Sequence, residues 1–290
     1  MPLTSLYTSV CLQRLMSTLE IKFSSLTDYD SFKAWLNNVQ LFGLNAAKAA
    51  GDLGGNMAYV PLITCIVSFI FAVTVLDQYF ARRKPYQLLW AIGLFMYCVS
   101  TFTEYWWNVQ GHVEIMYRLW YLVGAVLVAA YMGQGTLYLL MQRKKANIIM
   151  AVLGAATLYS AIRIFTVNID ISGLTMLTGV GILPIDVRVI LTPIFNTFGT
   201  LALVGGAVYS AIIFGRKRIL SHRVAANILI AFGALLPAAG GIHISTNGSL
   251  NLFFLLELAG VIIMFIGFMR TKEVFGLYRF PFIHGFKKVE

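Results

Sequence analysis

The chain has 290 residues, of which 59% are hydrophobic and only 12% carry a charge. Its mean hydropathy is +0.77, and its charged fraction is about half that of an ordinary soluble domain. These values exclude a soluble globular protein and predict an integral membrane protein. The net charge of +10 does not indicate a nucleic-acid-binding protein, because no basic helix face with interleaved aromatic residues accompanies it.

Residues 1–57 are more polar than the rest of the chain and form a predicted segment outside the membrane. The first residues lack the long apolar core and the cleavage site of a signal peptide, and Met16 is an alternative start. Apolar side chains recur at helical spacing between residues 31 and 51. We therefore expect an amphipathic helix near 31–50 that lies on the outer membrane surface or packs over the outer end of the bundle.

Seven apolar stretches follow, each about as long as the roughly 20 residues that a helix needs to cross a bilayer. Since none shows the alternating pattern of a barrel strand, all seven are predicted to be helices. The predicted fold is an all-α, polytopic, seven-transmembrane-helix bundle over residues 58–270. The predicted spans are 58–77, 87–107, 115–141, 146–167, 187–214, 224–245 and 250–269.

Basic residues mark one side of the predicted bundle. Most of the 22 lysines and arginines follow the first, third, fifth and seventh spans, whereas the loops 108–114, 168–186 and 246–249 contain none. By the positive-inside rule, the N-terminus is predicted to be outside and the C-terminus cytoplasmic. The tail, 271–290, alternates aromatic and basic residues, as expected for a segment at the level of the lipid headgroups. We expect a multi-pass protein of a prokaryotic cytoplasmic membrane.

Small residues and prolines within the spans indicate how the helices pack. Ala202, Gly206 and Ser210 are four residues apart and predict a close-packing face on the fifth span. Pro193 and Pro237 each remove a backbone hydrogen bond and predict kinks in the fifth and sixth spans, or a cavity opened by them.

The three cysteines show no CxxC or metal-binding spacing, and Cys65 and Cys98 fall within spans. We interpret these two as small apolar packing residues. The sequence contains no motif of a hydrolase, a nucleotide-binding protein or a zinc enzyme. No catalytic residue and no metal ligand are therefore predicted, and the sequence does not identify a cofactor.

Ionisable residues concentrate in the predicted outer half of the bundle. Glu257 lies about 10 Å below the outer end of the seventh span, at a depth where an unpaired charge is strongly unfavourable. We therefore expect an outer-side polar pocket in which opposite charges neutralise one another, with Glu257 as its deepest member. The candidate ligand-binding residues are Glu257, His243, Glu104, Arg118, Arg163, Arg188, Asp186 and Tyr121.

A structural interpretation competes with the pocket. Arg118 follows Glu114 by one helical turn and could pair with it, and Arg163 could extend its guanidinium outward to the membrane interface. His243 precedes a polar turn and is more typical of a hydrogen-bonded histidine than of a metal ligand. Glu257 fits this interpretation least, because a carboxylate is too short to reach the interface from that depth.

The chain resembles a group of uncharacterised bacterial seven-helix integral membrane proteins in three phrases, YRLWYLVGAVLVAAYMGQGTLYLL, LTPIFNTFGTLALVGGAVYSA and NILIAFGALLPAAGG. The likeness covers roughly 58–270 and rests on apolar helices together with Arg118, Asn227 and Pro237. It implies a seven-helix fold and no activity. Rhodopsins share the seven spans and the outer N-terminus, but the seventh span here lacks the lysine that retinal attachment requires.

We expect a non-enzymatic membrane protein that binds a small molecule, lipid or pigment in the outer-side pocket, alone or as an accessory subunit of a larger membrane complex. Its predicted partners are the lipid bilayer, other membrane proteins and a small ligand or pigment, but no nucleic acid. One alternative is a transporter or channel for a small solute, in which the prolines and intramembrane charges would line a path. Another is a membrane enzyme that acts on lipid headgroups, with Glu257 or His243 as general base.

Overall fold

The computed structural model describes residues 57–171, 174, 177, 183–216, 221–245 and 249–270. The predicted amphipathic helix near 31–50 and the tail, 271–290, lie outside these residues. All secondary structure in the described part of the chain is helical, and seven helices there are long and apolar enough to cross a membrane. The all-α fold and the seven predicted spans are thereby confirmed, and the chain is a multi-pass membrane protein.

The spans begin and end within a few residues of the predicted positions, except that the first continues to Arg82 instead of ending at residue 77. In chain order the elements are η1 (Met57–Tyr59), α3 (Val60–Arg82), α4 (Pro85–Val109), α5 (Glu114–Leu119), η2 (Trp120–Leu127), α6 (Val128–Leu140), α7 (Arg143–Thr166), η3 (Asp186–Leu191), α8 (Thr192–Arg216), α9 (Ser221–Ser245) and α10 (Leu250–Met269). The third span comprises α5, η2 and α6, and the fifth comprises η3 and α8; both contain a stretch of wide π-helical turns.

The turn between α3 and α4 shows how local sequence ends one span and starts the next. Arg83 adopts a left-handed conformation (φ 54°), and its N–H donates to the carbonyl of Tyr79 at 2.7 Å. Pro85 then begins α4, where its fixed φ suits a helix and its missing N–H leaves no bond unmade. The guanidinium of Arg83 lies 5.5 Å from the ring centroid of Phe80. This cation–π contact keeps the Arg83 side chain near the end of α3.

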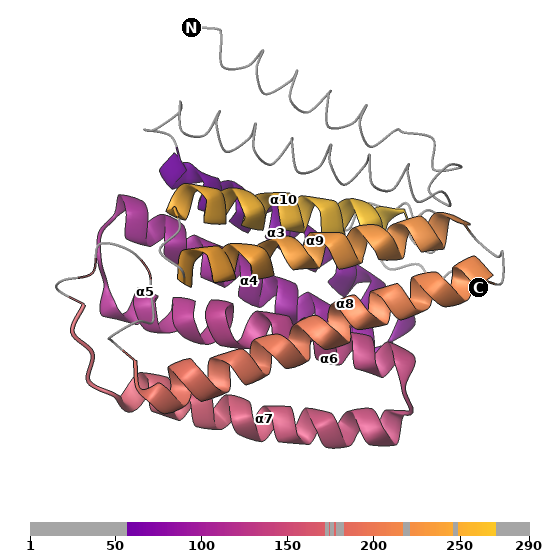
Figure 1. Cartoon of the computed structure of the whole chain (residues 1–290), viewed down its shortest axis with the longest axis horizontal. Helices are drawn as coiled ribbons and strands as arrows, with labels where there is room; N and C mark the ends of the chain where they lie inside the picture. The colour runs from indigo at the N-terminus through magenta and orange to yellow at the C-terminus, as the bar shows by residue number, and fades with distance from the viewer. Residues whose placement is uncertain are drawn as a thin grey trace, which may run out of the picture. The chain divides into compact units, whose positions relative to one another are not determined.

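Six of the seven spans form a closed ring, in which α3, α4, α6, α8, α9 and α10 each pack against the next and α10 returns to α3. α7 lies outside this ring and contacts α6, η2 and η3 (Figure 1). It is also the least buried span, with 17% of its most apolar stretch enclosed. The interior that matters for a buried site is therefore the space that the other six helices surround.

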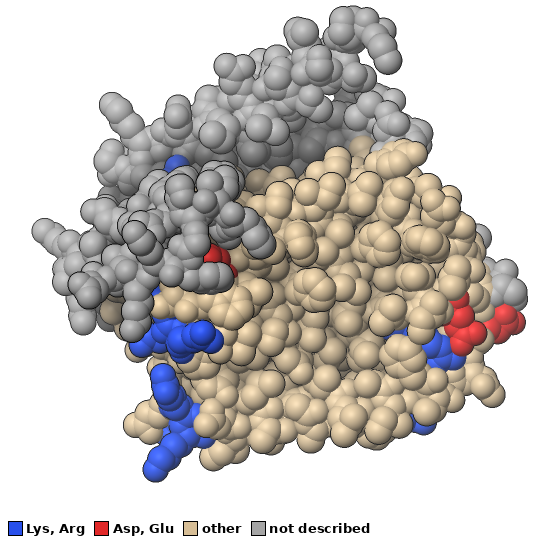
Figure 2. Space-filling model, turned by 180° about the vertical axis from the view of Figure 1, so that it is seen from behind, with Lys and Arg blue, Asp and Glu red and all other residues tan. Residues whose placement is uncertain are grey.

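Charged side chains gather at the two ends of the described bundle. On the face shown in Figure 2, Lys and Arg with a small acidic patch lie at one end, Asp and Glu with further basic residues lie at the opposite end, and a broad uncharged band separates them. We call the end that holds Met57 and Val109 the outer end, and the end that holds Arg82 and Leu140 the inner end, after the predicted orientation. The uncharged band matches the surface expected of helices surrounded by lipid.

Glycines let α6 and α8 approach each other at backbone distance. A Cβ atom added to Gly199 of α8 would lie 2.2 Å from the carbonyl carbon of Ala129, and one added to Gly133 would lie 2.6 Å from the carbonyl oxygen of Gly199. Gly206, from the predicted close-packing face of the fifth span, approaches Thr136 in the same way, at 2.4 Å. Close approach of small residues is the usual basis of helix association in lipid.

The contact between α9 and α10 also depends on glycine. Pro237 lies inside α9, and a Cβ atom on Gly260 of α10 would lie 2.6 Å from its Cδ. Gly233, one turn earlier in α9, would bring a Cβ to 2.8 Å from the carbonyl oxygen of Gly260. Pro193 is the second residue of α8 and follows the π-helical turns of η3 directly. Both intramembrane prolines thus lie where a helix is irregular or closely packed.

Gly199→Ala is expected to destabilise the protein by about 3 kcal/mol, the upper part of the usual range for overpacking, because the new methyl group meets backbone atoms that cannot rotate away. The measurement is thermal unfolding of the purified protein in mild detergent. Gly205→Ala on the same helix is the matched control, since a Cβ there meets nothing within 4 Å. Equal losses in both variants would contradict the close packing of α6 and α8.

Candidate functional site

Two glutamates from different helices meet inside the outer half of the bundle. Glu257 lies seven residues after the start of α10, about 10 Å deep at 1.5 Å per residue, and is 6% exposed. Glu104, near the outer end of α4, is 0% exposed. Their carboxyl groups lie near each other and interact electrostatically. We call Glu104 and Glu257 the carboxyl pair.

Two aromatic side chains hold the carboxyl pair in position. The indole Nε1–H of Trp120, the first residue of η2, donates to Oε1 of Glu104 at 2.9 Å. The hydroxyl of Tyr97, two turns before Glu104 on α4, donates to the backbone carbonyl of Glu257 at 3.1 Å. η2 approaches α4 this closely because Gly124 faces Ser100, where a Cβ would lie only 2.0 Å from the serine oxygen. Three segments of the chain therefore converge on the pair.

One oxygen of each carboxyl group remains without a partner. Oε2 of Glu104 and Oε2 of Glu257 are both buried and make no hydrogen bond within the described chain. Neither carboxyl group forms an ion pair with a described residue. Leaving a buried polar atom unsatisfied costs about 1–3 kcal/mol, and more if the group is charged. The pair is thus an energetically unfavourable arrangement in the outer half of the bundle interior.

The buried hydroxyl groups nearby are satisfied by their own helices. Thr64 and Ser68 on α3 donate to the carbonyls of residues three or four positions earlier, and Thr101 and Thr103 on α4 do the same, at 2.6 to 3.1 Å. Such bonds are the usual way in which Ser and Thr are accommodated inside membrane helices. They leave the carboxyl pair as the feature of this region that local structure does not explain.

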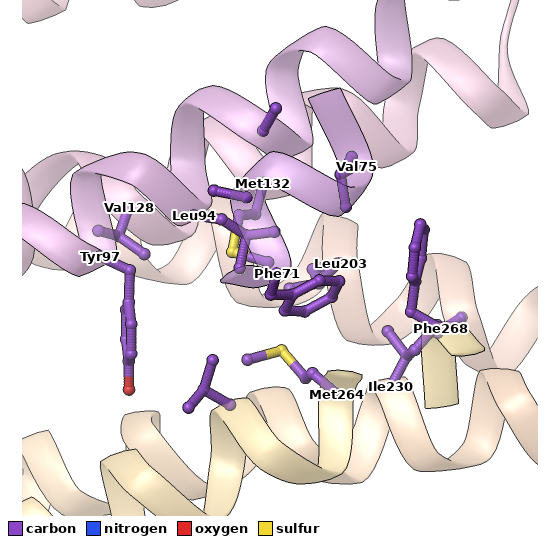
Figure 3. Packing of buried hydrophobic residues seen from close by; sticks show 14 of the residues in the cluster. Phe71, Val75, Leu94, Tyr97, Val128, Met132, Leu203, Ile230, Met264 and Phe268 are labelled. Atoms are coloured by element: carbon purple, nitrogen blue, oxygen red, sulfur yellow. The ribbon is translucent and has the colours of Figure 1, made fainter. Parts of the chain in front are cut away.

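An apolar layer lies between the carboxyl pair and the inner end. Tyr97 points towards α10 at the outer edge of this layer, and Phe71, Leu94, Met132 and Met264 fill its centre (Figure 3). Phe71 also stacks on a ring of α10 at a centroid distance of 4.8 Å. The layer extends over about 15 Å, the length of the ten residues of α4 that separate Tyr97 from the next buried polar side chain.

Glutamines occupy the inner side of this layer. Gln78 of α3 and Gln87 of α4 are buried, and Nε2 of Gln87 donates to Oε1 of Gln78 at 3.4 Å. Gln134 of α6 is fully buried and donates to the carbonyl of Ala146 at 2.8 Å, which ties α6 to the start of α7. The ring interior is therefore acidic in its outer half, apolar in the middle and neutral-polar towards the inner end.

The arginines do not neutralise Glu257, contrary to the expectation from sequence. Arg118 donates to Glu114, one turn earlier, and to the carbonyls of Ile164 and Val167 at the end of α7. The last carbonyls of a helix have no partner within it, and the five donors of a guanidinium can satisfy several at once. The pairing with Glu114 follows the structural interpretation of the sequence. The bonds to Ile164 and Val167 link the third span to the end of the fourth.

Arg163 and Asp186 also pair away from the carboxyl pair. Nε of Arg163 donates to Asp186 at 2.8 Å, and the hydroxyl of Tyr159 donates to the same carboxylate at 3.1 Å. The Arg163 and Asp186 side chains are 38% and 32% exposed. Because α7 lies outside the ring, this ion pair forms on the exterior of the bundle.

Tyr121 and Arg188 belong to a separate polar contact between the third and fifth spans. The hydroxyl of Tyr121 lies 3.0 Å from that of Thr192, which itself donates to the carbonyl of Val187 at 2.8 Å. Arg188 is near Tyr121, and its buried Nε has no described partner. Asn196 donates to the carbonyl of Ala125 at 2.6 Å. These bonds join the π-helical turns of η2 to the start of α8.

His243 lies near the outer end of α9, and its Nε2 accepts the backbone N–H of Ser249 at 3.1 Å, so the histidine braces the turn before α10. This contact agrees with its interpretation as a hydrogen-bonded residue. In the part of the chain that the structure describes, no three His, Cys, Asp or Glu side chains come together in a way that could hold a metal ion. The predicted site residues thus divide among several places, and Glu104 and Glu257 are the two that meet inside the ring.

Sequence reasoning did not include Trp120 or Tyr97 among the site residues. Tyr97 lies seven residues before Glu104 on the same helix face, so helical periodicity could have identified it. Trp120 lies 16 residues from Glu104 in another span, and no sequence periodicity relates the two residues. No protein-family model, curated protein or solved structure matches this chain.

Glu257→Gln is expected to raise the free energy of unfolding by about 1–3 kcal/mol, because the amide removes an acidic group from apolar surroundings and can donate to the unsatisfied Oε2 of Glu104. Thermal unfolding in mild detergent would measure the gain. Glu114→Gln is the control, since that carboxyl is 52% exposed and already bound to Arg118. A clear loss of stability in Glu257→Gln would mean that its carboxyl group already has a favourable partner.

Proposed function

We propose that this protein is a non-enzymatic membrane protein that binds a small cationic molecule at the carboxyl pair, in the outer half of the bundle. The observation that supports it is that two buried carboxyl groups lie together, each with an unsatisfied oxygen and neither with a basic partner among the described residues. Carboxyl groups inside a membrane normally pair with opposite charge or mark a binding site. A ligand with a positive charge would supply that charge.

An ammonium group suits the chemistry of the carboxyl pair. It presents several N–H donors from one atom, so it can bond the free Oε2 of Glu104 and that of Glu257 together. Trp120 and Tyr97 donate to Oε1 of Glu104 and to the backbone carbonyl of Glu257, so they leave both Oε2 atoms available to such a ligand. The amine could belong to a free solute, a pigment or a lipid headgroup, since all three offer the same donors.

The orientation of the chain is part of this proposal. Basic residues gather at the inner end, as the positive-inside rule requires of a cytoplasmic end, so the carboxyl pair would be approached from outside the cell (Figure 2). A prokaryotic cytoplasmic membrane is the proposed location. Membership of a larger membrane complex remains a prediction.

A transporter is the second candidate, and the buried glutamines favour it. Gln78 and Gln87, on α3 and α4, continue the polar character of the interior towards the inner end. The apolar layer centred on Phe71 and Leu94 separates them from the carboxyl pair, so transport would require this layer to open. Binding from the outer side leaves this layer closed and requires only that the outer helix ends admit the ligand to Glu104 and Glu257, which are 0% and 6% exposed. We therefore rank it first.

The binding proposal predicts that octylammonium stabilises the full-length protein in phosphatidylcholine nanodiscs and that octanol, which has the same chain and no charge, does not. At 100 times its Kd the cation would add about 2.7 kcal/mol to the free energy of unfolding. Glu104→Gln and Glu257→Gln should each lose this response relative to their own baseline, whereas Glu114→Gln should keep it. Nanodiscs that contain phosphatidylethanolamine would compete with octylammonium if the natural ligand is a lipid amine. Equal stabilisation by octanol, or an unchanged response in Glu257→Gln, would contradict the proposal.

The proposed orientation predicts that green fluorescent protein fused to the C-terminus is fluorescent in a bacterial host, because that protein folds to its fluorescent form in the cytoplasm. Alkaline phosphatase fused at the same position should be inactive, since it requires export. The reciprocal control is a pair of fusions after Gln110, between the second and third spans, where phosphatase should be active. The opposite pattern at either position would overturn the orientation.

A further inference from the structure

Two cysteines from neighbouring spans bring their sulfur atoms into contact. Sγ of Cys65 on α3 lies 3.2 Å from Sγ of Cys98 on α4, and both residues are free thiols. They are 33 residues apart in the chain, so the contact is made by the packing of the two helices. The interpretation of these cysteines as simple packing residues does not account for this contact.

The geometry of the two thiols is close to that needed for a covalent bond. A disulfide has an S–S distance of about 2.05 Å, so the sulfur atoms would have to approach by about 1.2 Å. Ser68, one turn after Cys65, donates to the backbone carbonyl of Cys65 at 3.0 Å. A polar group thus accompanies the pair in surroundings that are otherwise apolar.

The thiols are reached more easily from the lipid than from water. Both lie within membrane spans. Cys98 is buried at 8% exposure, whereas Cys65 is half-buried at the edge of the outward face of α3. Ile66 and Phe69, the next residue and the residue one turn on, are 52% and 48% exposed. An oxidant that reaches Cys65 would therefore have to be soluble in the hydrocarbon region.

We propose that Cys65 and Cys98 form a reversible redox site, a dithiol that a lipid-soluble quinone oxidises to an interhelical disulfide. Two S–H bonds break and one S–S bond forms, and the two protons and two electrons pass to the quinone, which becomes a quinol. A dithiol reductant reverses the reaction by thiol–disulfide exchange. The product links α3 to α4 one residue from Tyr97, in the same outer half as the carboxyl pair. The proposal does not depend on cation binding there.

The experiment uses full-length protein with Cys11→Ser, so that Cys65 and Cys98 are the only two thiols of the three cysteines in the chain. The protein in nanodiscs is exposed to a fully substituted short-chain ubiquinone, which cannot add to thiols, and then denatured and labelled with a maleimide. Intact-protein mass spectrometry counts the labels, and parallel samples receive oxidised glutathione, a water-soluble oxidant. Cys65→Ser and Cys98→Ser in the same background are the controls.

We expect two labels before ubiquinone, none after it, and two again after treatment with dithiothreitol. Each single-cysteine control should keep its one label throughout, and glutathione should react much more slowly than the quinone. Two labels that persist after ubiquinone would overturn the redox site. Faster oxidation by glutathione would overturn access from the lipid, and loss of the label in a single-cysteine control would show that the reaction is not disulfide formation between these two residues.

Discussion

The structure depends on one constraint, which is that polar groups inside the helix ring must find partners among the side chains and carbonyls that the ring encloses. Threonines and serines meet this constraint within their own helices, Asn196 meets it by bonding across helices, and Gln87 meets it in part through its Nε2. Glu104 meets it in part, through Trp120, and Glu257 lies near Glu104 with an unsatisfied oxygen of its own. Buried atoms of Gln87, Gln134, Arg188 and three tryptophans also lack a hydrogen-bond partner. The carboxyl pair stands out among them because two acidic groups with unsatisfied oxygens lie together.

The polarity of the ring interior differs between the outer half, where the carboxyl pair lies, and the middle of the bundle. The outer half of the interior carries acids and hydroxyls, and the middle is closed by aromatic and aliphatic side chains that include Phe71, Leu94 and Met264 (Figure 3). A closed apolar layer resists the passage of ions and water, because their transfer into it is unfavourable. This arrangement supports a site that is filled and emptied from one side, and the glycine contacts between α6 and α8 and between α9 and α10 keep the layer tight.

The arginines illustrate why charge counting alone is a weak guide to a membrane interior. Opposite charges in the outer half were expected to converge, yet Arg118 is used at the end of α7 and Arg163 meets Asp186 on the exterior. Carbonyl oxygens at helix ends compete with carboxylates for a guanidinium, and they lie nearer to the membrane surface, where the arginine keeps part of its hydration. Glu104 and the backbone of Glu257 instead accept hydrogen bonds from Trp120 and Tyr97, which are uncharged and can be buried at lower cost.

Number, length and order of the spans could be predicted from the sequence, since hydropathy and length are local properties that each helix carries by itself. The depth of Glu257 and the pairing of Arg118 with Glu114 were predictable for the same reason, as both follow from helical rise within one segment. The tertiary structure alone decided that Glu257 meets Glu104, that Trp120 donates to that pair, and that Cys65 touches Cys98. These contacts depend on which helices are neighbours and how each is rotated about its axis, and both are decided by the fit of small residues such as Gly199 and Gly124 across interfaces between distant parts of the chain.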